Sequence, residues 1–415
     1  MNSDRGGNDS ELTSRRTLLK YFGAIGAGSA LGGLAFKALA TDDRVRLPFD
    51  NGERRLVAYP QKRPLIVLTS RPPQLETPFA VFNDGLITPN DAFFVRYHLS
   101  DIPLSIDPEA FRLEVKGNVD RSLSLSLADL KTGFEPVELV AVHQCSGNSR
   151  GFVEPRVAGG QLGHGAMGNA RWRGVPLKAV LDRAGVQAGS RQVTFNGLDR
   201  AALPETPDFV KALDLDHASD GEVMIAYAMN GEYLPWLNGF PLRLVVPGYY
   251  GTYWVKHLNE ITVIDHVFDG YWMASAYRMP DNDCACVEPG QRATATVPLR
   301  RFNVRSFITN LADGARVKAR AATLVKGIAF DGGYGISDVL LSWDGGRNWS
   351  ETRLGSDLGR YSFREWRTEL RLPAGTHELK VRAINRIGQS QPMTPLWNPP
   401  GYMRNVVETV RVVAT

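Results

Sequence analysis

The chain has 415 residues, which is enough for two or three domains. Hydrophobic residues make up 43% and charged residues 22%, a balance that excludes a disordered chain and a polytopic membrane protein. The net charge of +4 is too small to predict a nucleic-acid partner. The content of 41 glycines and 25 prolines favours strands and loops over helical bundles. Three cysteines are too few for a disulfide framework, so each is judged singly.

The first forty residues have the order of an export signal. Arg15 and Arg16 precede an apolar run over 21–39, and Ala38-Leu39-Ala40 is a small-residue cleavage site. Paired arginines followed by leucine and lysine are typical of a twin-arginine signal, which exports folded proteins. A general secretory signal or a membrane anchor is the alternative, but the run is only moderately apolar. We expect residues 1–40 to be this signal and the mature protein to be periplasmic, with no membrane span after cleavage.

The remaining chain divides into three parts. Residues 41–89 are rich in proline and arginine with little periodicity, which predicts an extended arm. Over 90–290, strand and helix patterns mix. From 291 to 415 short alternating segments separated by turns predict an antiparallel sandwich. The fold class is therefore α+β, a mixed domain followed by a β-sandwich. The segments are strands at 93–98, 111–115, 137–142, 242–246, 317–321, 339–343 and 379–383, and helices at 125–130 and 176–184.

Cys145 lies where the strand pattern of 137–142 gives way to the turn residues 146–148. At this position we expect the sulfur to be accessible at the end of the strand and not buried in the hydrophobic core. A presented thiolate is a nucleophile or a soft metal ligand, and Arg150 would favour the thiolate electrostatically. The alternative is a small buried apolar cysteine.

Arg96 stands among aromatic and apolar residues, so we expect it to be partly buried. A buried guanidinium needs an anion or a carboxylate partner. The planar fork of arginine suits oxyanions, because it donates two parallel hydrogen bonds. A structural ion pair is the alternative.

At these residues the chain resembles the sulfite oxidase family of molybdenum enzymes. The resemblance spans nearly the whole chain after residue 40, and its C-terminal part is similar to the family's immunoglobulin-like dimerisation domain. It is carried by Gln144-Cys145-Ser146-Gly147-Asn148-Ser149-Arg150, Phe94-Val95-Arg96-Tyr97-His98, Gly165–Trp172 with Gly174–Leu177, Asn238–Arg243 with Pro247-Gly248 and Trp254-Val255-Lys256, Trp343–Gly346 and Pro395–Asn398.

The resemblance implies a Mo-molybdopterin cofactor and oxidation of sulfite to sulfate. Cys145 would be the protein's ligand to molybdenum. Arg96 and Arg150 would bind the sulfite dianion, and Tyr277 would place its hydroxyl near the reactive oxygen, with Tyr271 as a nearby competitor. His98 would be a polar neighbour, with a purely structural role as the alternative.

The resemblance also implies a set of cofactor contacts. Asn238 departs from the histidine of animal members, which puts any charge-based contact there in doubt. The positions that match cofactor contacts are Phe94, Val95, Arg96, Tyr97, His98, Cys145, Asp199, Asn238, Arg243, Trp254, Val255 and Lys256.

The sequence has no Cys-x-x-Cys-His motif for an attached haem. We therefore expect no haem, a homodimer as in the family, and an external electron acceptor, a c-type cytochrome. Cys284 and Cys286 match no family role. Cys-x-Cys alone has no second pair for zinc, and a bridge between them would close a small ring, so we expect structural or incidental thiols.

Three other functions compete with sulfite oxidation. A sulfane dehydrogenase-like subunit of a thiosulfate-oxidising complex shares the two-domain plan. An exported methionine sulfoxide reductase would lack the sandwich over 291–415. A non-catalytic exported binding module would leave Cys145 structural and would carry no metal.

Overall fold

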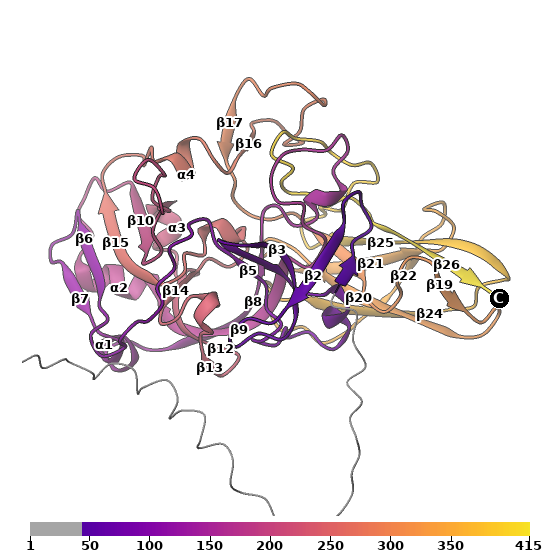
Figure 1. The fold of residues 1–415 in the computed structure, drawn as a ribbon, viewed down its shortest axis with the longest axis horizontal. Helices are drawn as coiled ribbons and strands as arrows, with labels where there is room; N and C mark the ends of the chain where they lie inside the picture. The colour runs from indigo at the N-terminus through magenta and orange to yellow at the C-terminus, as the bar shows by residue number, and fades with distance from the viewer. Residues whose placement is uncertain (1–43) are drawn as a thin grey trace, which may run out of the picture. The chain divides into compact units, whose positions relative to one another are not determined.

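The described part of the chain, residues 44–415 of a computed structural model, consists mainly of β-strands with short helices between them (Figure 1). The predicted signal peptide, residues 1–40, lies outside the described residues. The described strands form six sheets. No helix within 44–415 is long and apolar enough to cross a membrane.

The segment expected to be an extended arm forms a sheet. Its strands pair in chain order, and the last one carries Arg96. The paired strands bury Leu65, Leu75 and Tyr97 in a small core, and the weak hydrophobic periodicity of the segment did not predict these strands. The strands are β1 (Arg44–Arg46), β2 (Glu53–Val57), β3 (Leu65–Ser70), β4 (Pro73–Glu76) and β5 (Val95–Arg96), the last shorter than the expected 93–98.

Two larger sheets follow. The first has the order β11-β10-β15-β6-β7, with β15 and β6 parallel, and comprises β6 (Leu113–Gly117), β7 (Leu123–Leu125), β10 (Gln192–Gly197), β11 (Lys211–Asp214) and β15 (Leu258–Ile264). The second has the order β13-β12-β9-β8, with β14 beside β12, and comprises β8 (Val137–Gln144), β9 (Met167–Pro176), β12 (Met224–Met229), β13 (Glu232–Tyr233) and β14 (Arg243–Val245).

The two longest α-helices follow their sequence signals. Ser126 and Asp129 form a capping box at the start of α1. In α2 the apolar residues recur at helical spacing, and Gly185 ends the helix in the left-handed conformation. The helices are α1 (Leu127–Thr132), α2 (Leu177–Ala184), α3 (Leu215–Ala218) and α4 (Tyr271–Ala274), with 3-10 turns η1 (Phe79–Asn83), η2 (Arg150–Phe152), η3 (Trp236–Asn238) and η4 (Gly251–Tyr253).

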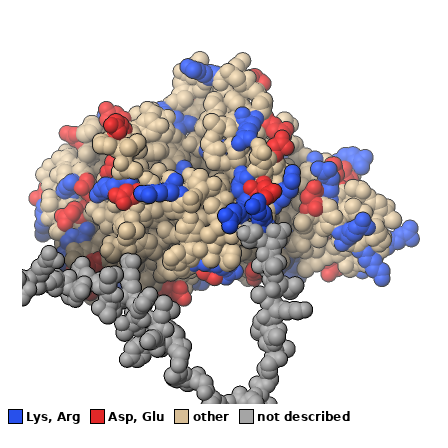
Figure 2. All heavy atoms as spheres, in the orientation of Figure 1, with Lys and Arg blue, Asp and Glu red and all other residues tan. Residues whose placement is uncertain are grey.

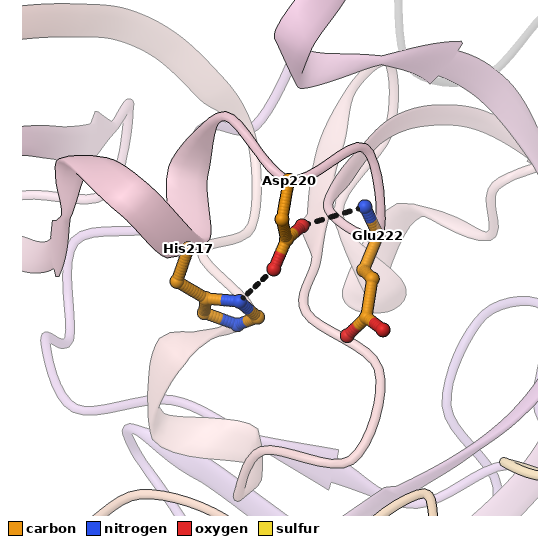
Figure 3. Close-up of side chains that lie close together, drawn as sticks. All are labelled: His217, Asp220 and Glu222. Carbon is orange, nitrogen blue, oxygen red and sulfur yellow. Dashed lines mark hydrogen bonds and ion pairs between the residues drawn. The ribbon is translucent and has the colours of Figure 1, made fainter.

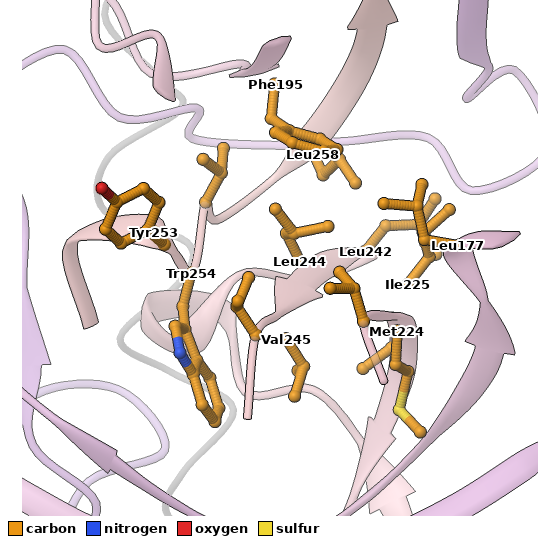
Figure 4. Close-up of a cluster of buried hydrophobic side chains, with 14 of the residues drawn as sticks. Leu177, Phe195, Met224, Ile225, Leu242, Leu244, Val245, Tyr253, Trp254 and Leu258 are labelled. Atoms are coloured by element: carbon orange, nitrogen blue, oxygen red, sulfur yellow. The ribbon is translucent and has the colours of Figure 1, made fainter. Parts of the chain in front are cut away.

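One large core joins both sheets and α2. Phe195 of β10, Ile225 of β12 and Leu244 of β14 point into it (Figure 4). Trp254 belongs to the same core and, as shown below, also lines the site. The site is therefore built on the rigid interior of the fold and not on surface loops alone.

A two-stranded hairpin, β16 (Arg278–Pro280) and β17 (Thr296–Pro298), carries the loop with Cys284 and Cys286. The structure joins these cysteines in a disulfide, so the expectation of free thiols is wrong. The left-handed conformation of Ala285 turns the chain back on itself. This turn leaves the two Cα atoms 5.1 Å apart, within the range of a disulfide.

The C-terminal residues form a sandwich of two sheets. The first sheet has the order β18-β20-β24-β23 and comprises β18 (Arg305–Ile308), β20 (Thr323–Phe330), β23 (Arg353–Leu354) and β24 (Arg364–Leu370). The second sheet has the order β19-β26-β25-β21-β22 and comprises β19 (Ala315–Val317), β21 (Ile336–Ser342), β22 (Ser350–Glu351), β25 (Gly375–Asn385) and β26 (Thr409–Ala414). The sandwich is not wholly antiparallel, because β19 and β26 run parallel. The strand expected at 317–321 ends at Val317, since its partner β26 ends at Ala414.

A separate aromatic core joins the sandwich to the preceding domain. Tyr250 and Tyr277 pack there with Phe307, Phe330 and Phe363 of the sandwich sheets and their flanks. The backbone N–H of Val142 in β8 donates to the carbonyl of Tyr361 at 2.9 Å. The two domains therefore share buried surface, and removal of 291–415 would expose an apolar core.

Candidate functional site

Cys145 ends β8 and opens a tight turn. Its backbone N–H donates to the carbonyl of Ala166 at 2.9 Å, and its carbonyl accepts from Asn148 N–H at 3.0 Å. The Asn148 side chain in turn accepts from Ala166 N–H at 3.1 Å. These bonds hold the loop on both sides of the cysteine. Cys145 is a free, half-buried thiol on the wall of a cavity, as its position in the sequence predicts.

The segment 94–98 supplies a second wall. Phe94, Arg96 and His98 line the cavity, whereas Val95 and Tyr97 point away into the small core under the first sheet. Successive side chains of an extended chain alternate between two faces, which accounts for the division. Of the five residues from 94 to 98 that were expected to contact a cofactor, every second one, beginning with Phe94, therefore reaches the cavity.

The third wall comes from the segment 251–256, which begins with η4. Trp254 and Lys256 line the cavity, and Val255 lies in the main core. Lys256 Nζ donates to the carbonyl of Arg96 at 2.7 Å and lies 4.2 Å from the centre of the Tyr97 ring. Lys256 thus ties two walls of the cavity together. The full lining is Phe94, Arg96, His98, His143, Cys145, Ser146, Phe209, Gly251, Thr252, Trp254, Lys256 and Tyr277.

Tyr277 reaches the cavity, whereas its competitor Tyr271 is about half exposed on the surface. The Tyr277 hydroxyl forms a hydrogen bond with Nε2 of His98. The His98 ring stacks on Phe209 with centroids 3.9 Å apart and planes 11° apart. Burial raises the pKa of Tyr277 and lowers that of His98, so the phenol and the imidazole are both neutral at pH 7.

Arg150 does not line the cavity. Its Nε donates to the carbonyl of Pro400 at 2.9 Å, and its Nη1 donates to the carbonyl of Gly160 at 3.3 Å. Its guanidinium lies 4.9 Å from the ring centre of Tyr402. The expected substrate arginine is therefore held behind the cavity wall by a turn of the sandwich domain.

Arg243 and Lys256 are side by side, joined by a backbone bridge at the start of β14. Burial lowers the pKa of Arg243 to about 9, and burial with the neighbouring Arg243 lowers that of Lys256. Asp199, whose own pKa is raised by burial, opposes the shift at Lys256. Within 44–415 no carboxylate lies within ion-pair distance of Arg96, Arg243 or Lys256. This concentration of buried positive charge requires an anion.

Asn238 lies below the cavity and not on its wall. Its side chain donates to the carbonyl of Phe94 at 3.0 Å and accepts a hydrogen bond from Nζ of Lys62. Lys62 also donates to the carbonyls of Asn90 at 2.6 Å and Phe93 at 3.0 Å. The residue that differs from animal members therefore supports the strand of Phe94, and beside it lies a buried lysine of the loop between β2 and β3, whose pKa is lowered by burial to about 7.

Several residues of this site were not predicted. His143 is sandwiched between Phe94, at 4.8 Å, and Trp254, at 4.7 Å between ring centres. Its position two residues before Cys145 in a strand pattern is the signal that could have found it. Gly251 and Thr252 lie within a family stretch, but no role was assigned to them. Phe209 and Tyr402 carry no local signal, because only the tertiary fold brings them here.

A second cluster, away from the cavity, brings His217, Asp220 and Glu222 within 4.8 Å of one another (Figure 3). Nδ1 of His217 is 2.6 Å from the Asp220 carboxylate. Glu222 forms ion pairs with Arg301 and Arg360 of the sandwich domain. Two guanidinium groups already compensate that carboxylate, so we interpret the cluster as a polar link between the domains. On the face drawn in Figure 2, basic and acidic groups are interspersed.

Comparisons with known proteins decide the family. Residues 99–272 match the oxidoreductase molybdopterin binding domain, and residues 297–414 match the Mo-co oxidoreductase dimerisation domain. Sulfite oxidase of Gallus gallus is 34% identical over 362 residues, which cover 83% of this chain and 77% of that protein. The chain belongs to the sulfite oxidase family.

Two further comparisons agree with this family and with its fold. Mitochondrial sulfite oxidase of Homo sapiens is 34% identical over 85% of this chain, but the chain spans only 66% of that protein. The solved structure of the sulfane dehydrogenase SoxCD from Paracoccus pantotrophus superposes with a TM-score of 0.71 at 25% identity, covering 86% of this chain and 87% of that one. The family and its fold are therefore those predicted, a molybdopterin-binding domain followed by a β-sandwich.

The side chains in and around the cavity fit the chemistry of the molybdenum cofactor of the sulfite oxidase family. Cys145 offers a free thiol at the wall, as a soft metal requires. Arg243 has a buried Nε with no hydrogen-bond partner, and Thr252 has a buried hydroxyl with none, within the described residues. Together with Lys256 these groups can satisfy the phosphate and polar edges of a molybdopterin. When bound, this cofactor would supply oxygen-atom transfer and take up two electrons.

Proposed function

We propose that this protein is a haem-free sulfite dehydrogenase that oxidises sulfite to sulfate. The balanced reaction is sulfite plus water to sulfate, two protons and two electrons. The observation that supports it is the convergence of one free thiol, one arginine, one histidine and one phenol on a single cavity, Cys145, Arg96, His98 and Tyr277.

Each of these residues has a separate task. Cys145 holds the metal. Arg96 binds the sulfite dianion. Arg150 adds its positive charge from behind the cavity wall. The positive charge of both arginines stabilises the bound anion while sulfite becomes sulfate. With Nε2–H of the neutral His98 donating to the Tyr277 oxygen, the Tyr277 hydroxyl keeps its one hydrogen to donate toward the reacting oxygen, and the contact with His98 fixes the direction of that bond. The stacking of His98 on Phe209 keeps both groups in place before substrate arrives.

The location and partners belong to the same proposal. The protein crosses the membrane folded by its twin-arginine signal and works in the periplasm. It passes its two electrons singly to an external acceptor, a c-type cytochrome. The match of 297–414 to a dimerisation domain supports a homodimer formed through the sandwich.

The deciding experiment replaces the thiol. Cys145→Ser exchanges a soft thiolate for a hydroxyl, so we expect folded protein with little molybdenum and no sulfite turnover. Cys284→Ser serves as the matched control, because that sulfur lies in the hairpin loop outside the cavity. Sulfite turnover by Cys145→Ser at the wild-type rate would refute the proposal.

A second candidate is favoured by the superposition on the sulfane dehydrogenase. That function would need a carrier-bound sulfane at the cavity in place of a free anion. Parallel assays of the molybdenum-loaded protein with free sulfite and with a persulfide on a carrier protein separate the two. Turnover of the persulfide alone would make the sulfane activity the correct one.

A further inference from the structure

Arg150 lies in a cradle of three glycines from three separate segments. A Cβ at Gly147 would lie 2.9 Å from the guanidinium carbon, and one at Gly159 would lie 2.6 Å from Nη1. At Gly401, a residue with φ of +60°, it would lie 3.0 Å from Cγ of Arg150. A Cβ does not approach other atoms closer than 3.0 Å, so a side chain at Gly147 or Gly159 would displace the arginine, whereas one at Gly401 would meet Val157 first, at 2.5 Å. The chain therefore keeps this space for one guanidinium in one orientation.

Tyr402 joins this cradle to the catalytic tyrosine candidate. The guanidinium carbon of Arg150 lies 4.9 Å from the centre of the Tyr402 ring, within cation–π distance. The same ring stacks on Tyr277, with centroids 5.4 Å apart and planes 9° apart. Burial raises the pKa of Tyr402, so its hydroxyl is neutral, and Arg150, Cys145 and Arg96 all act on it electrostatically. One ring therefore contacts both Arg150 and Tyr277.

The turn that carries Tyr402 is fastened at both ends. The buried side chain of Asn398 accepts from Tyr402 N–H at 2.9 Å and donates to the Tyr402 carbonyl at 3.0 Å. The N–H of Met403 donates to the carbonyl of Ser146 at 3.2 Å. Ser146 is the neighbour of Cys145, so the turn is bonded directly to the loop of the metal ligand candidate.

We propose that Tyr402, contributed by the sandwich domain, is a positioning residue for oxyanion binding. Its ring holds the Arg150 guanidinium and the Tyr277 phenol in one fixed relation. An incoming sulfite or sulfate therefore meets a Tyr277 phenol already in place, with the Arg150 charge fixed behind the cavity wall, and no binding energy is spent on ordering either group. The identity of the substrate rests on the proposed function, but the anion-binding role does not require turnover.

The experiment compares Tyr402→Phe, which keeps the ring, with Tyr402→Leu, which removes it. Sulfate binding is measured by calorimetry on molybdenum-loaded protein, and sulfite kinetics are measured beside it. We expect Tyr402→Leu to raise the Kd for sulfate and the KM for sulfite at least tenfold while kcat changes less than threefold. We expect Tyr402→Phe to stay within twofold of wild type. Tyr334→Leu, at an exposed tyrosine of the sandwich, is the control and should change neither.

Two results would overturn the proposal. Sulfate binding at wild-type strength in Tyr402→Leu would show that the ring does not position the anion site. If Tyr402→Phe and Tyr402→Leu weakened sulfate binding equally, the loss would be due to the Tyr402 hydroxyl and not to its ring. Molybdenum content and thermal unfolding show whether each variant folds, and Gly147→Ala, whose Cβ would lie 2.9 Å from the Arg150 guanidinium carbon, should reproduce the Leu result if Tyr402→Leu does not fold. A wild type that binds sulfate without oxidising sulfite would refute the proposed function alone.

Discussion

Arg150 and Pro400, 250 positions apart in the sequence, are joined by a hydrogen bond of 2.9 Å from Nε to the carbonyl oxygen. The bond connects the loop of Cys145 to the last turn of the sandwich domain. It explains why the sandwich cannot be regarded as an independent dimerisation module. Part of the predicted anion site exists only when both domains are folded against one another.

Arg150→Lys should weaken sulfite turnover although the charge is kept. Lysine has no planar fork, so it cannot donate to Pro400 and Gly160 together while facing the Tyr402 ring. We expect kcat/KM to fall by about 2–3 kcal/mol, or roughly 30- to 150-fold, the range of a hydrogen bond to a charged group. Steady-state kinetics measure this, with Arg156→Lys at an exposed position as control. Unchanged kinetics would remove Arg150 from the mechanism.

Tyr277→Phe tests which tyrosine acts. The change removes the hydroxyl that contacts His98 and keeps the ring stacked on Tyr402. We expect kcat to fall about 100-fold with full molybdenum content, the scale for one lost donor at a reacting oxygen. Tyr271→Phe, at the half-exposed competitor, should behave as wild type. If Tyr271→Phe lowered kcat and Tyr277→Phe did not, Tyr271 would be the active-site tyrosine instead of Tyr277.

Arg243→Gln should reduce retention of the cofactor. The variant removes a buried positive charge whose Nε has no partner in the described residues. We expect molybdenum and pterin per chain to fall below half of the wild-type value, because an anionic group loses its buried counterion. Metal analysis and pterin fluorescence give the readout, and Arg173→Gln on the exposed face of β9 is the control. Full cofactor content in Arg243→Gln would show that the phosphate binds elsewhere.

The protein should lose stability as the pH falls below 6.5, partly through His257. Nδ1 of His257 donates to the carbonyl of Phe240, so Nε2 accepts from the Tyr97 hydroxyl at 2.6 Å and the ring is neutral. Burial lowers the pKa of His257 from 6.5 to about 4. Between these values the unfolded chain binds the additional proton, so stability present above pH 6.5 is lost as the pH falls toward 4.

The loss from this one histidine is at most about 3 kcal/mol. Denaturant unfolding at pH 7, 6 and 5 should show a shallower pH dependence in His257→Gln than in wild type. If the free energy of unfolding of His257→Gln and of wild type changed equally with pH, proton binding by His257 would not be linked to unfolding.

The Cys284–Cys286 disulfide should contribute little to stability. It closes a loop of three residues, for which loop-closure entropy gives about 1–2 kcal/mol. The Cys284→Ser, Cys286→Ser double variant should therefore unfold at slightly lower denaturant and retain its molybdenum. A larger loss would mean that the hairpin supports the turn 397–403, to which Val287 N–H is bonded through the Trp397 carbonyl at 2.9 Å.

A homodimer should be tested by surface substitutions and not by truncation. The sequence division at residue 291 predicts that deletion of the sandwich gives monomers. The shared aromatic core around Tyr250 and Phe330 means that deletion would expose apolar surface and cause aggregation instead. Charged substitutions on the exposed sandwich face, followed by sedimentation, leave this core intact.

Local patterns in the sequence were sufficient to predict many of the helices and strands, and the family motifs were sufficient to predict much of the cavity wall. The helical spacing of 177–184 and the capping box of Ser126 arise from contacts between near neighbours, which a sequence displays. The strand pattern before Cys145 was also visible, although β8, which ends at Gln144, forms only by pairing with β9. The family motifs added Arg96, His98, Trp254, Lys256 and Tyr277, all of which reach the cavity.

Only the tertiary structure decided the rest. Residues 41–89 have little periodicity, yet the strands from 44 to 76 form a sheet, because consecutive strands pair across short loops and bury side chains against the rest of the fold. The motif that contains Arg150 does not reveal that its guanidinium lies behind the wall, held by Pro400 and Tyr402. Sequence determined which chemical groups this protein possesses. Which of them face the cavity was decided by long-range packing, since the direction of a side chain depends on neighbours that the chain brings together only when folded.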